Sequence, residues 1–465
     1  MLKTLDTPGD TSWFTRDRFG LFIHWGLYAL AARHEWVKSK EQIPDDVYDT
    51  YFRHFDPDLY DPEAWADAAA DAGMKYFVIT TKHHEGFCLW DSKLTDYKAP
   101  NTPAGRDLLR PMVEAFNAKG LRTGFYHSLI DWRHPQYIID GQNHPRRGEI
   151  KSKGEVDGML AQAAPGSSAA KQAQATGGGP NAGRDQQQYI DYLHGQVREL
   201  LTDYDPDILW FDFSWNTEQS REAGLDFTLG KGREAWGSEK LYAMIRELAP
   251  NIILNDRLDL PLGGGRSGGW DVKTPEQVTP RQWVHVDGQP VVWEACQTFS
   301  GSWGYYRDEH TWRDTDELIR CLIDCVSKGG NLLLNVGPTG RGEFDERALA
   351  RLRGIGQWMK RHGRAIYGCT QAPQEIDCPR DCRLTWNPEA KRLYVHLFAY
   401  PYKHLRLDGL AERVEYAQFL HDASELRGPD SWHRRQLGSG DNDLILNLPQ
   451  MKPSVTIPVV ELFLK

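Results

Sequence analysis

Charged and polar side chains end several short apolar runs of the chain, and these side chains are the first candidates for chemistry. Asp212 lies in the run Ile208-Leu-Trp-Phe-Asp-Phe, where an ionised carboxylate needs a partner because burying it alone is prohibitive. One interpretation is a structural aspartate that pairs with Arg257 or with backbone amides. The other is a catalytic carboxylate, which can attack the anomeric carbon of a sugar when a second carboxyl group about 5 to 5.5 Å away donates a proton.

Four glutamates are candidates for that second carboxyl group: Glu276, Glu294, Glu35 and Glu85. Their spacing in the sequence does not choose among them. Glu276 lies in an irregular segment rich in Gly and Pro, which is typical of a loop that arches over a pocket and carries an acid that later acts as a base. The alternative for Glu276 is a solvated loop side chain.

Three histidines, His24, His83 and His84, follow predicted strands and raise the question of a metal site. Adjacent side chains of a regular strand point to opposite faces, so two ligands on one side need His-x-His rather than His-His spacing. Cys378 and Cys382 have no second pair that would complete a zinc site. We therefore expect no metal site. The histidines are interpreted as partners of hydroxyl groups, and the alternative for each is a structural histidine.

Seven short apolar runs must position these residues, and helical patterns separate them. Strands that alternate with helices predict a parallel sheet with both faces covered, and this many units in about 365 residues fits an α/β fold with a (β/α)8-like barrel, whose chemistry lies at the carboxyl-terminal rim. An eighth strand is not evident. The expected strands are residues 19–25, 76–81, 123–129, 208–213, 252–255, 291–293 and 332–336.

Helix signals support this alternation. Asp61-Pro62 supplies an N-cap and a first-turn proline for a helix over 63–73. Apolar residues at helical spacing predict two further helices, over 189–200 and 318–326.

The pattern changes after Gly368 to alternating runs without helices. This change predicts a catalytic barrel domain over residues 1–368 and a C-terminal antiparallel β-sandwich over residues 369–465. Within the first domain, an Ala- and Gly-rich stretch at about 150–184 is too poor in large apolar groups to offset its ordering entropy, which predicts a flexible insertion.

Composition excludes several classes of protein. The 465 residues carry a net charge of -10 without a Lys/Arg block, so we expect no nucleic acid partner. No apolar run is long enough to span a membrane, and no signal peptide is visible. We expect a cytoplasmic protein, or a periplasmic or secreted one if the sequence is a mature form, and a homo-oligomer. The 17 Trp, 19 Tyr and 17 Phe, many beside polar residues, suit the hydroxylated rim and apolar faces of a sugar.

Several segments, taken in order, resemble the α-L-fucosidases of glycoside hydrolase family 29. Each segment alone is weak, but the ordered set over residues 13–368 is specific. The matching segments are Arg18-Phe-Gly-Leu-Phe-Ile-His-Trp-Gly-Leu-Tyr, Glu35-Trp36, Lys82-His-His-Glu-Gly-Phe, Trp210-Phe-Asp, Asn255-Asp-Arg, Lys273-Thr-Pro-Glu, Trp293-Glu-Ala-Cys, Ser302-Trp-Gly-Tyr and Val326-Ser-Lys-Gly-Gly-Asn-Leu-Leu-Leu-Asn-Val-Gly-Pro.

The resemblance implies a retaining exo-α-L-fucosidase that hydrolyses terminal fucosyl linkages of oligosaccharides or glycoconjugates by double displacement, without a metal or cofactor. It implies that Asp212 is the nucleophile, Glu276 the general acid/base, and Arg257 a neighbour of both. It also implies substrate-binding roles for His24, Glu35, Trp36, His83, His84 and Tyr126 around the sugar hydroxyls, and for Trp303 against the fucose methyl group.

Two positions depart from the family pattern. Phe213 follows the nucleophile position where many members have Gly, and His127 stands where a second Tyr is common, so the hydroxyl contact assigned to Tyr126 has His127 as an alternative.

Two alternative functions are kept: a related barrel glycosidase acting on galactosides, and a catalytically silent fucose-binding protein. A galactoside enzyme would need a polar partner near Trp303 for the extra hydroxyl group.

Overall fold

The computed structural model describes most of the chain, and the account below is confined to these residues. They are residues 3–150, 179–215, 227, 230–262, 269–437 and 440–465. The flexible insertion predicted at about 150–184 falls largely on residues 151–178, which lie outside the described residues.

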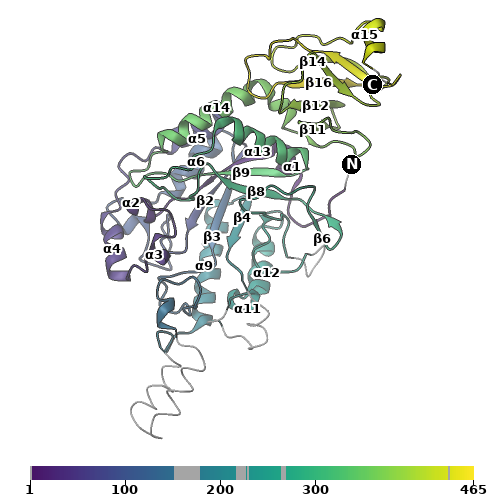
Figure 1. Ribbon diagram of the computed structural model, residues 1–465. Coiled ribbons are helices and arrows are strands. Elements are labelled where there is room, and N and C mark those ends of the chain that lie inside the picture. The colour runs from purple at the N-terminus through teal and green to yellow at the C-terminus, as the bar shows by residue number, and fades with distance from the viewer. Residues whose placement is uncertain (1–2, 151–178, 216–226, 228–229, 263–268, 438–439) are drawn as a thin grey trace, which may run out of the picture.

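A parallel sheet of seven strands forms the centre of the first domain (Figure 1). Its order is β5-β4-β3-β2-β1-β9-β8, and all neighbouring pairs are parallel. The strands are β1 (Phe19–Ile23), β2 (Tyr76–Lys82), β3 (Arg122–Ser128), β4 (Ile208–Asp212), β5 (Ile253–Leu254), β8 (Glu294–Thr298) and β9 (Asn331–Val336).

Residues 272–276 close the sheet between β5 and β8 through isolated parallel bridges. Asn255 pairs with Val272 on the β5 side, and Lys273 and Glu276 pair with Trp293 and Cys296 on the β8 side. The segment thus takes the place of an eighth strand and completes the ring of a (β/α)8-like barrel. Its Lys-Thr-Pro-Glu sequence has no apolar alternation, which is why no eighth strand was evident.

Six of the seven expected strands agree with the structure to within a few residues. The run at 291–293 is the exception, because the strand there is β8 and begins only at Glu294. Strand β8 is fully buried although it contains Glu294 and Gln297. A pattern based on apolar residues therefore placed this strand too early.

Helices cover the outer side of the sheet, and α5, α6, α13 and α14 lie beside one another along it (Figure 1). The three predicted helices are present as α5, α9 and α13, and the Asp61 carboxylate caps α5 by accepting a hydrogen bond from Ala64 N at 3.0 Å. The helices of this domain are α1 (Ser12–Asp17), α2 (Tyr28–Ala31), α3 (Val37–Lys40), α4 (Asp45–His54), α5 (Pro62–Asp71), α6 (Leu109–Ala118), α9 (Gln186–Tyr204), α11 (Arg233–Trp236), α12 (Ser238–Leu248), α13 (Thr315–Ser327) and α14 (Glu346–His362).

Small elements complete the first domain. Two short strands, β6 (His285–Val286) and β7 (Gln289–Pro290), pair with each other, and three 3₁₀ turns lie at η1 (Ala99–Asn101), η2 (Arg147–Glu149) and η3 (Gly363–Ala365). None of the helices among the described residues is long and apolar enough to span a membrane.

The C-terminal residues form two antiparallel sheets around a separate apolar core. The five-stranded sheet has the order β10-β11-β12-β16-β14, and β13 pairs with β15. The fold class, a barrel followed by an antiparallel sheet domain, is confirmed. The elements are β10 (Thr370–Gln371), β11 (Cys382–Asn387), β12 (Arg392–Leu397), β13 (His404–Leu407), β14 (Val414–Phe419), α15 (Ser431–Gln436), β15 (Leu444–Asn447) and β16 (Val459–Leu464).

The two domains are in contact along α14 and α13. Trp358 of α14 donates its indole N–H to Ile457 O at 3.4 Å, and Asp324 of α13 pairs with Arg383 of β11 at 2.7 Å. We infer that the boundary lies near residue 368, because η3 ends at Ala365 and the antiparallel pairing begins at Thr370.

The barrel interior is lined by every second residue of its strands. Ile208 and Trp210 point inward from β4, together with Phe22 of β1 and Tyr126 of β3. Asp212 lies two residues after Trp210 on β4, so the same alternation directs its side chain to the interior face. The chain therefore presents Asp212 at the carboxyl-terminal end of a tightly packed interior.

The opposite end of the interior contains an uncharged glutamate. Glu294 is 2% exposed and accepts a hydrogen bond from Tyr76, whose hydroxyl also accepts one from Asn331 at 3.2 Å. Burial raises the pKa of Glu294 from 4.5 to about 8. The folded protein therefore keeps a proton on Glu294 in a pH range where the unfolded chain has lost it.

This difference predicts a pH-dependent stability. Between about pH 4.5 and pH 8 the unfolded chain binds fewer protons at this position, so the free energy of unfolding falls as the pH rises, in total by an amount on the order of a few kcal/mol. Glu294→Gln removes the titration and should flatten that fall in denaturant unfolding curves at pH 5, 6, 7 and 8. The exposed Glu389→Gln is the matched control, and a Glu294→Gln curve parallel to wild type would contradict the assignment.

Candidate active site

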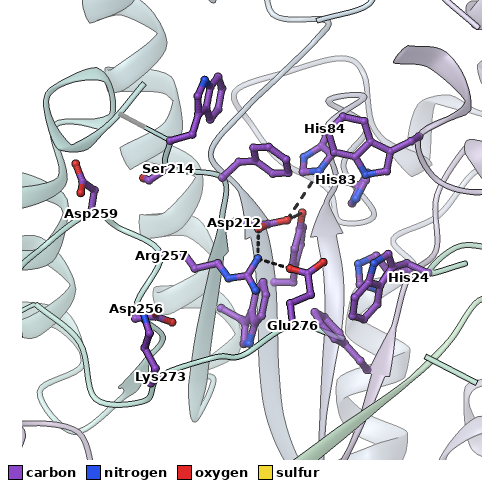
Figure 2. A pocket seen from close by; sticks show the side chains of 17 residues that line it. His24, His83, His84, Asp212, Ser214, Asp256, Arg257, Asp259, Lys273 and Glu276 are labelled. Carbon is purple, nitrogen blue, oxygen red and sulfur yellow. Dashed lines mark hydrogen bonds and ion pairs between the residues drawn. The ribbon is translucent and has the colours of Figure 1, made fainter. Parts of the chain in front are cut away.

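A cavity of about 540 Å³ opens at the carboxyl-terminal rim of the barrel, directly above Asp212 (Figure 2). This volume lies in the range of pockets that enclose ligands of drug size. Nine of the ten side chains expected at the site line the cavity: His24, Trp36, His83, His84, Tyr126, Asp212, Arg257, Glu276 and Trp303.

Arg257 joins the two carboxylates that are far apart in the sequence. Its Nη1 atom lies 2.7 Å from Asp212 Oδ1 and 2.8 Å from Glu276 Oε2, so these two oxygens are at most about 5.5 Å apart. This upper limit fits retaining glycosidases, whose carboxyl groups are about 5 to 5.5 Å apart, and lies below the roughly 6.5 to 9.5 Å of inverting enzymes. Figure 2 shows the arginine between the two acids.

Asp212 lies in a buried environment that both disfavours and supports its charge. Burial raises the pKa of Asp212 above its ordinary value, while Arg257 and a 2.8 Å hydrogen bond from the Tyr126 hydroxyl act in the opposite direction. The neighbouring carboxylates raise the pKa of Arg257 even though burial acts against its charge. The guanidinium therefore stays charged, and its face stacks on the Trp210 ring at 4.4 Å.

Glu276 has a different environment from Asp212. Its side chain is 43% exposed, whereas that of Asp212 is 13% exposed. It lies on the irregular segment 272–276 rather than on a strand with continuous pairing. One carboxylate is therefore fixed at the floor of the cavity, and the other is at its mouth, within reach of solvent.

The histidines of the cavity are neutral. Burial lowers the pKa of His24 to about 3 and those of His83 and His84 well below the ordinary value. Asn335 donates its own amide to a backbone carbonyl, so its Oδ1 accepts a hydrogen bond from His24 Nδ1 at 2.6 Å. Ser128 likewise donates to a carbonyl and accepts from His84 Nδ1 at 2.7 Å. In His24 and His84, Nε2 is left as an acceptor, which suits a hydroxyl group.

His83 and His84 both line the cavity although they are adjacent in sequence. Strand β2 ends at Lys82, so the two residues lie beyond the regular strand and the alternation argument does not apply to them. Their ring centroids are 3.9 Å apart. No group of three or more His, Cys, Asp or Glu side chains suited to a metal ion occurs in the part of the chain that the structure describes.

Glu35 is the expected site residue that does not line the cavity. Its carboxylate accepts hydrogen bonds from the backbone N–H groups of Gly304 at 2.8 Å and Trp303 at 3.2 Å. The structure thus places Glu35 behind the loop that presents Trp303, where it holds the position of that ring.

Tyr126 faces the cavity, and His127 does not. The Tyr126 side chain points into the barrel toward Asp212, whereas His127 points to the outer side and lies 3.0 Å from Thr81 Oγ1. The alternation of side chains along β3 explains this difference, and of these two side chains only Tyr126 lines the cavity.

The remaining two glutamate candidates lie away from the pair of carboxylates. Glu294 is at the far end of the barrel interior, where it bonds to Tyr76. Glu85 is 1% exposed and lies behind His83, whose Nδ1 is 3.8 Å from Glu85 Oε2. Neither residue lines the cavity.

Further side chains line the cavity without having been expected there. Phe22 and Trp210 precede His24 and Asp212 by two positions, so strand periodicity was a signal that could have identified them. The others come from irregular segments, for which the sequence offered no such signal: Ser214, Trp215, Asp256, Asp259 and Lys273.

Phe213, where many family members have Gly, forms part of the cavity wall in a backbone conformation that favours glycine. Its φ angle is 78°, which costs an L-residue on the order of 1 kcal/mol or more. The ring packs against Trp36 at 5.3 Å, His84 at 5.1 Å and Trp215 at 5.5 Å between centroids. These contacts extend the aromatic wall from the histidines toward the outer part of the cavity.

A parallel barrel whose rim holds two carboxylates at this separation, within an aromatic pocket, defines a glycoside hydrolase of the retaining class. The family model described as alpha-L-fucosidase matches residues 2–364. The chain belongs to the alpha-L-fucosidase family, and its activity is that of a retaining α-L-fucosidase.

Solved structures and curated relatives agree with this family. Alpha-L-fucosidase isoenzyme 1 from Paenibacillus thiaminolyticus is 41% identical, with a TM-score of 0.83 and 98% of both chains covered. A trapped covalent intermediate of a family 29 alpha-L-fucosidase from Bacteroides thetaiotaomicron is 27% identical, with a TM-score of 0.76, 100% of this chain and 98% of that chain covered. The human tissue alpha-L-fucosidase is 26% identical over 97% of this chain and 88% of its own length.

The shared guanidinium leads to a prediction for the pH profile. A carboxylate that acts as a nucleophile is active only when ionised, so activity falls as the pH drops through its pKa. Arg257 lowers the pKa of Asp212, so Arg257→Gln should shift the acid limb of kcat/KM to higher pH. Arg257→Lys keeps a positive charge and should shift the limb less. An unchanged acid limb in Arg257→Gln would show that this ion pair does not control the titration of Asp212.

Proposed function

We propose that Asp212 is the nucleophile and Glu276 the general acid/base of a double displacement. One observation carries this assignment: a single nitrogen of Arg257 contacts both carboxylates, which holds them at the separation that a retaining mechanism needs. The difference in exposure fits the two roles, because the nucleophile contacts only the sugar whereas the acid/base must meet the leaving group and then water.

In the first step, Asp212 attacks the anomeric carbon while the bond to the leaving oxygen breaks, and Glu276 transfers its proton to that oxygen. The product of this step is a fucosyl ester of Asp212. In the second step, the Glu276 carboxylate takes a proton from water, and the water oxygen replaces the ester oxygen at the anomeric carbon. Two inversions give L-fucose with retained configuration, and both carboxyl groups return to their starting states.

The other cavity residues support a role in binding a terminal fucosyl group of oligosaccharides or glycoconjugates. His24, His83, His84 and Tyr126 offer hydrogen-bonding groups for the hydroxyls. Trp303 lies 5.1 Å from the His24 ring and 5.9 Å from Phe22, so an apolar surface borders the hydroxyl-binding groups. Such a surface accepts the methyl group of a 6-deoxy sugar, whereas galactose would leave its extra hydroxyl without a partner.

The predictions of a cytoplasmic location and of a homo-oligomer stay predictions.

Asp212→Gly tests the nucleophile. Removing the attacking carboxylate should lower turnover of an aryl α-L-fucoside by on the order of 10⁴-fold or more. Added azide should restore part of the turnover, because it fits the space that the carboxylate leaves, and should give the glycosyl azide of inverted configuration. NMR of the product identifies that configuration. Near-normal turnover without azide would overturn the role of Asp212.

Glu276→Ala tests the acid/base. Loss of proton donation should lower kcat/KM by roughly 10² to 10⁴-fold for substrates with poor leaving groups. Activated aryl fucosides need little protonation and should be affected much less in the fucosylation step. Aryl galactosides serve as a specificity control for the wild type. An equal loss on good and poor leaving groups would contradict acid catalysis by Glu276.

A further inference from the structure

Segment 272–276, which carries Glu276, is held in the barrel in an unusual way. On the β8 side it has ordinary backbone hydrogen bonds, from Glu294 N to Lys273 O at 2.9 Å and from Cys296 N to Pro275 O at 3.1 Å. On the other side, β5 contains only two residues and its pairing reaches no further than Asn255. Thr274 therefore lies beyond the end of β5 and lacks a neighbouring backbone partner from that strand.

Side chains of the residues after β5 replace the missing backbone partners of Thr274. Asp256 Oδ1 accepts a hydrogen bond from Thr274 N at 2.9 Å, in place of a strand carbonyl. Arg257 Nη2 donates to Thr274 O at 3.3 Å, in place of a strand N–H group. The segment with Glu276 is thus attached to β5 through two charged side chains.

The Thr274 hydroxyl links these two side chains to each other. It donates to Asp256 Oδ1 at 2.6 Å and accepts a hydrogen bond from Arg257 Nε at 3.3 Å. Thr274 is 5% exposed, so water does not easily replace these bonds. Two contacts along Thr274 fix the plane of the guanidinium, and the remaining Nη1 atom is the one that reaches Asp212 and Glu276.

Lys273 balances the charge of Asp256. Its Nζ lies 2.5 Å from Asp256 Oδ2, on the side away from the Thr274 contacts. An unpaired Asp256 carboxylate would compete with Asp212 for the guanidinium, because all three groups occur around one cavity. Pairing with Lys273 therefore leaves Arg257 available for the two carboxylates.

We propose that Thr274 and Asp256 are positioning residues of the reaction. They act through Arg257 and through the backbone of segment 272–276, and they set the separation and mutual orientation of the carboxyl groups of Asp212 and Glu276. The proposal rests on the roles proposed above for those two carboxylates.

Thr274→Val and Thr274→Ser form the matched pair that tests the proposal. Valine has the size and shape of threonine but lacks the hydroxyl, so Asp256 Oδ1 and Arg257 Nε each lose a partner. Serine keeps the hydroxyl and loses only a methyl group. Thermal unfolding of both variants shows whether the fold is kept.

The informative measurement is kcat/KM on a series of aryl α-L-fucosides whose leaving groups differ in pKa. We expect Thr274→Val to lose roughly 10- to 100-fold on the poorest leaving groups and clearly less on the best, because a displaced Glu276 donates its proton poorly. The acid limb of the pH profile should also move to higher pH, because a released Arg257 no longer lowers the pKa of Asp212 as much. Thr274→Ser should stay within about 3-fold of wild type on every substrate.

Two results would overturn the proposal: equal behaviour of the Val and Ser variants, or a Val variant that loses the same factor on all leaving groups with an unchanged pH profile. If Thr274→Val does not fold, Asp256→Ala is used instead. It removes the oxygen that accepts from both the backbone N–H and the hydroxyl of Thr274, so the leaving-group dependence should steepen in the same direction, and a wild-type dependence would count against the proposal. Azide rescue of Asp212→Gly does not depend on Thr274, so failure of the carboxylate roles and failure of this proposal are distinguishable.

Discussion

The sharing of one guanidinium nitrogen between two carboxylates is the interaction on which the site depends. Asp212 and Glu276 repel each other whenever both are ionised, and Arg257 lies between them at 2.7 and 2.8 Å. The cation is held by the Trp210 ring beneath it and by Thr274 beside it. Without this cation, the ionised forms of the two groups would meet at the rim with no compensating charge.

Graded burial separates the roles of the carboxyl groups in this barrel. Glu294, deep in the interior, keeps its proton up to a pKa of about 8 and takes no part in the cavity. Asp212, whose side chain is 13% exposed, has a cation and a tyrosine hydroxyl as partners, and both favour its ionised form. Glu276, at the mouth, is accessible to solvent. One scaffold thus places three carboxyl groups in three environments: the packed interior, an ion pair at its end and the solvent-accessible mouth of the cavity.

The sequence predicted the regular part of the site better than the irregular part. Asp212 was found because it ends an apolar strand, and period-two alternation would also have identified Phe22 and Trp210. Glu276 could not be chosen from spacing, because its segment has neither a strand pattern nor a helix pattern, and only the family resemblance selected it. Glu35 was expected at the hydroxyls, but the hydrogen bonds that place it behind Trp303 are made to backbone amides, which leave no trace in sequence.

The short length of β5 explains why the irregular segment and the site occur together. A longer β5 would pair with residues 273–276 through backbone groups, and the side chains of Asp256 and Arg257 would then alternate across the sheet instead of reaching Thr274. Because the strand stops at Leu254, the next residues are free to turn their charged ends toward the closing segment. Two backbone hydrogen bonds are replaced by side-chain bonds, and one of those side chains is the cation that the carboxylates require. The part of the barrel with the fewest backbone pairs, between β5 and segment 272–276, is therefore also the place where Arg257 contacts Asp212 and Glu276.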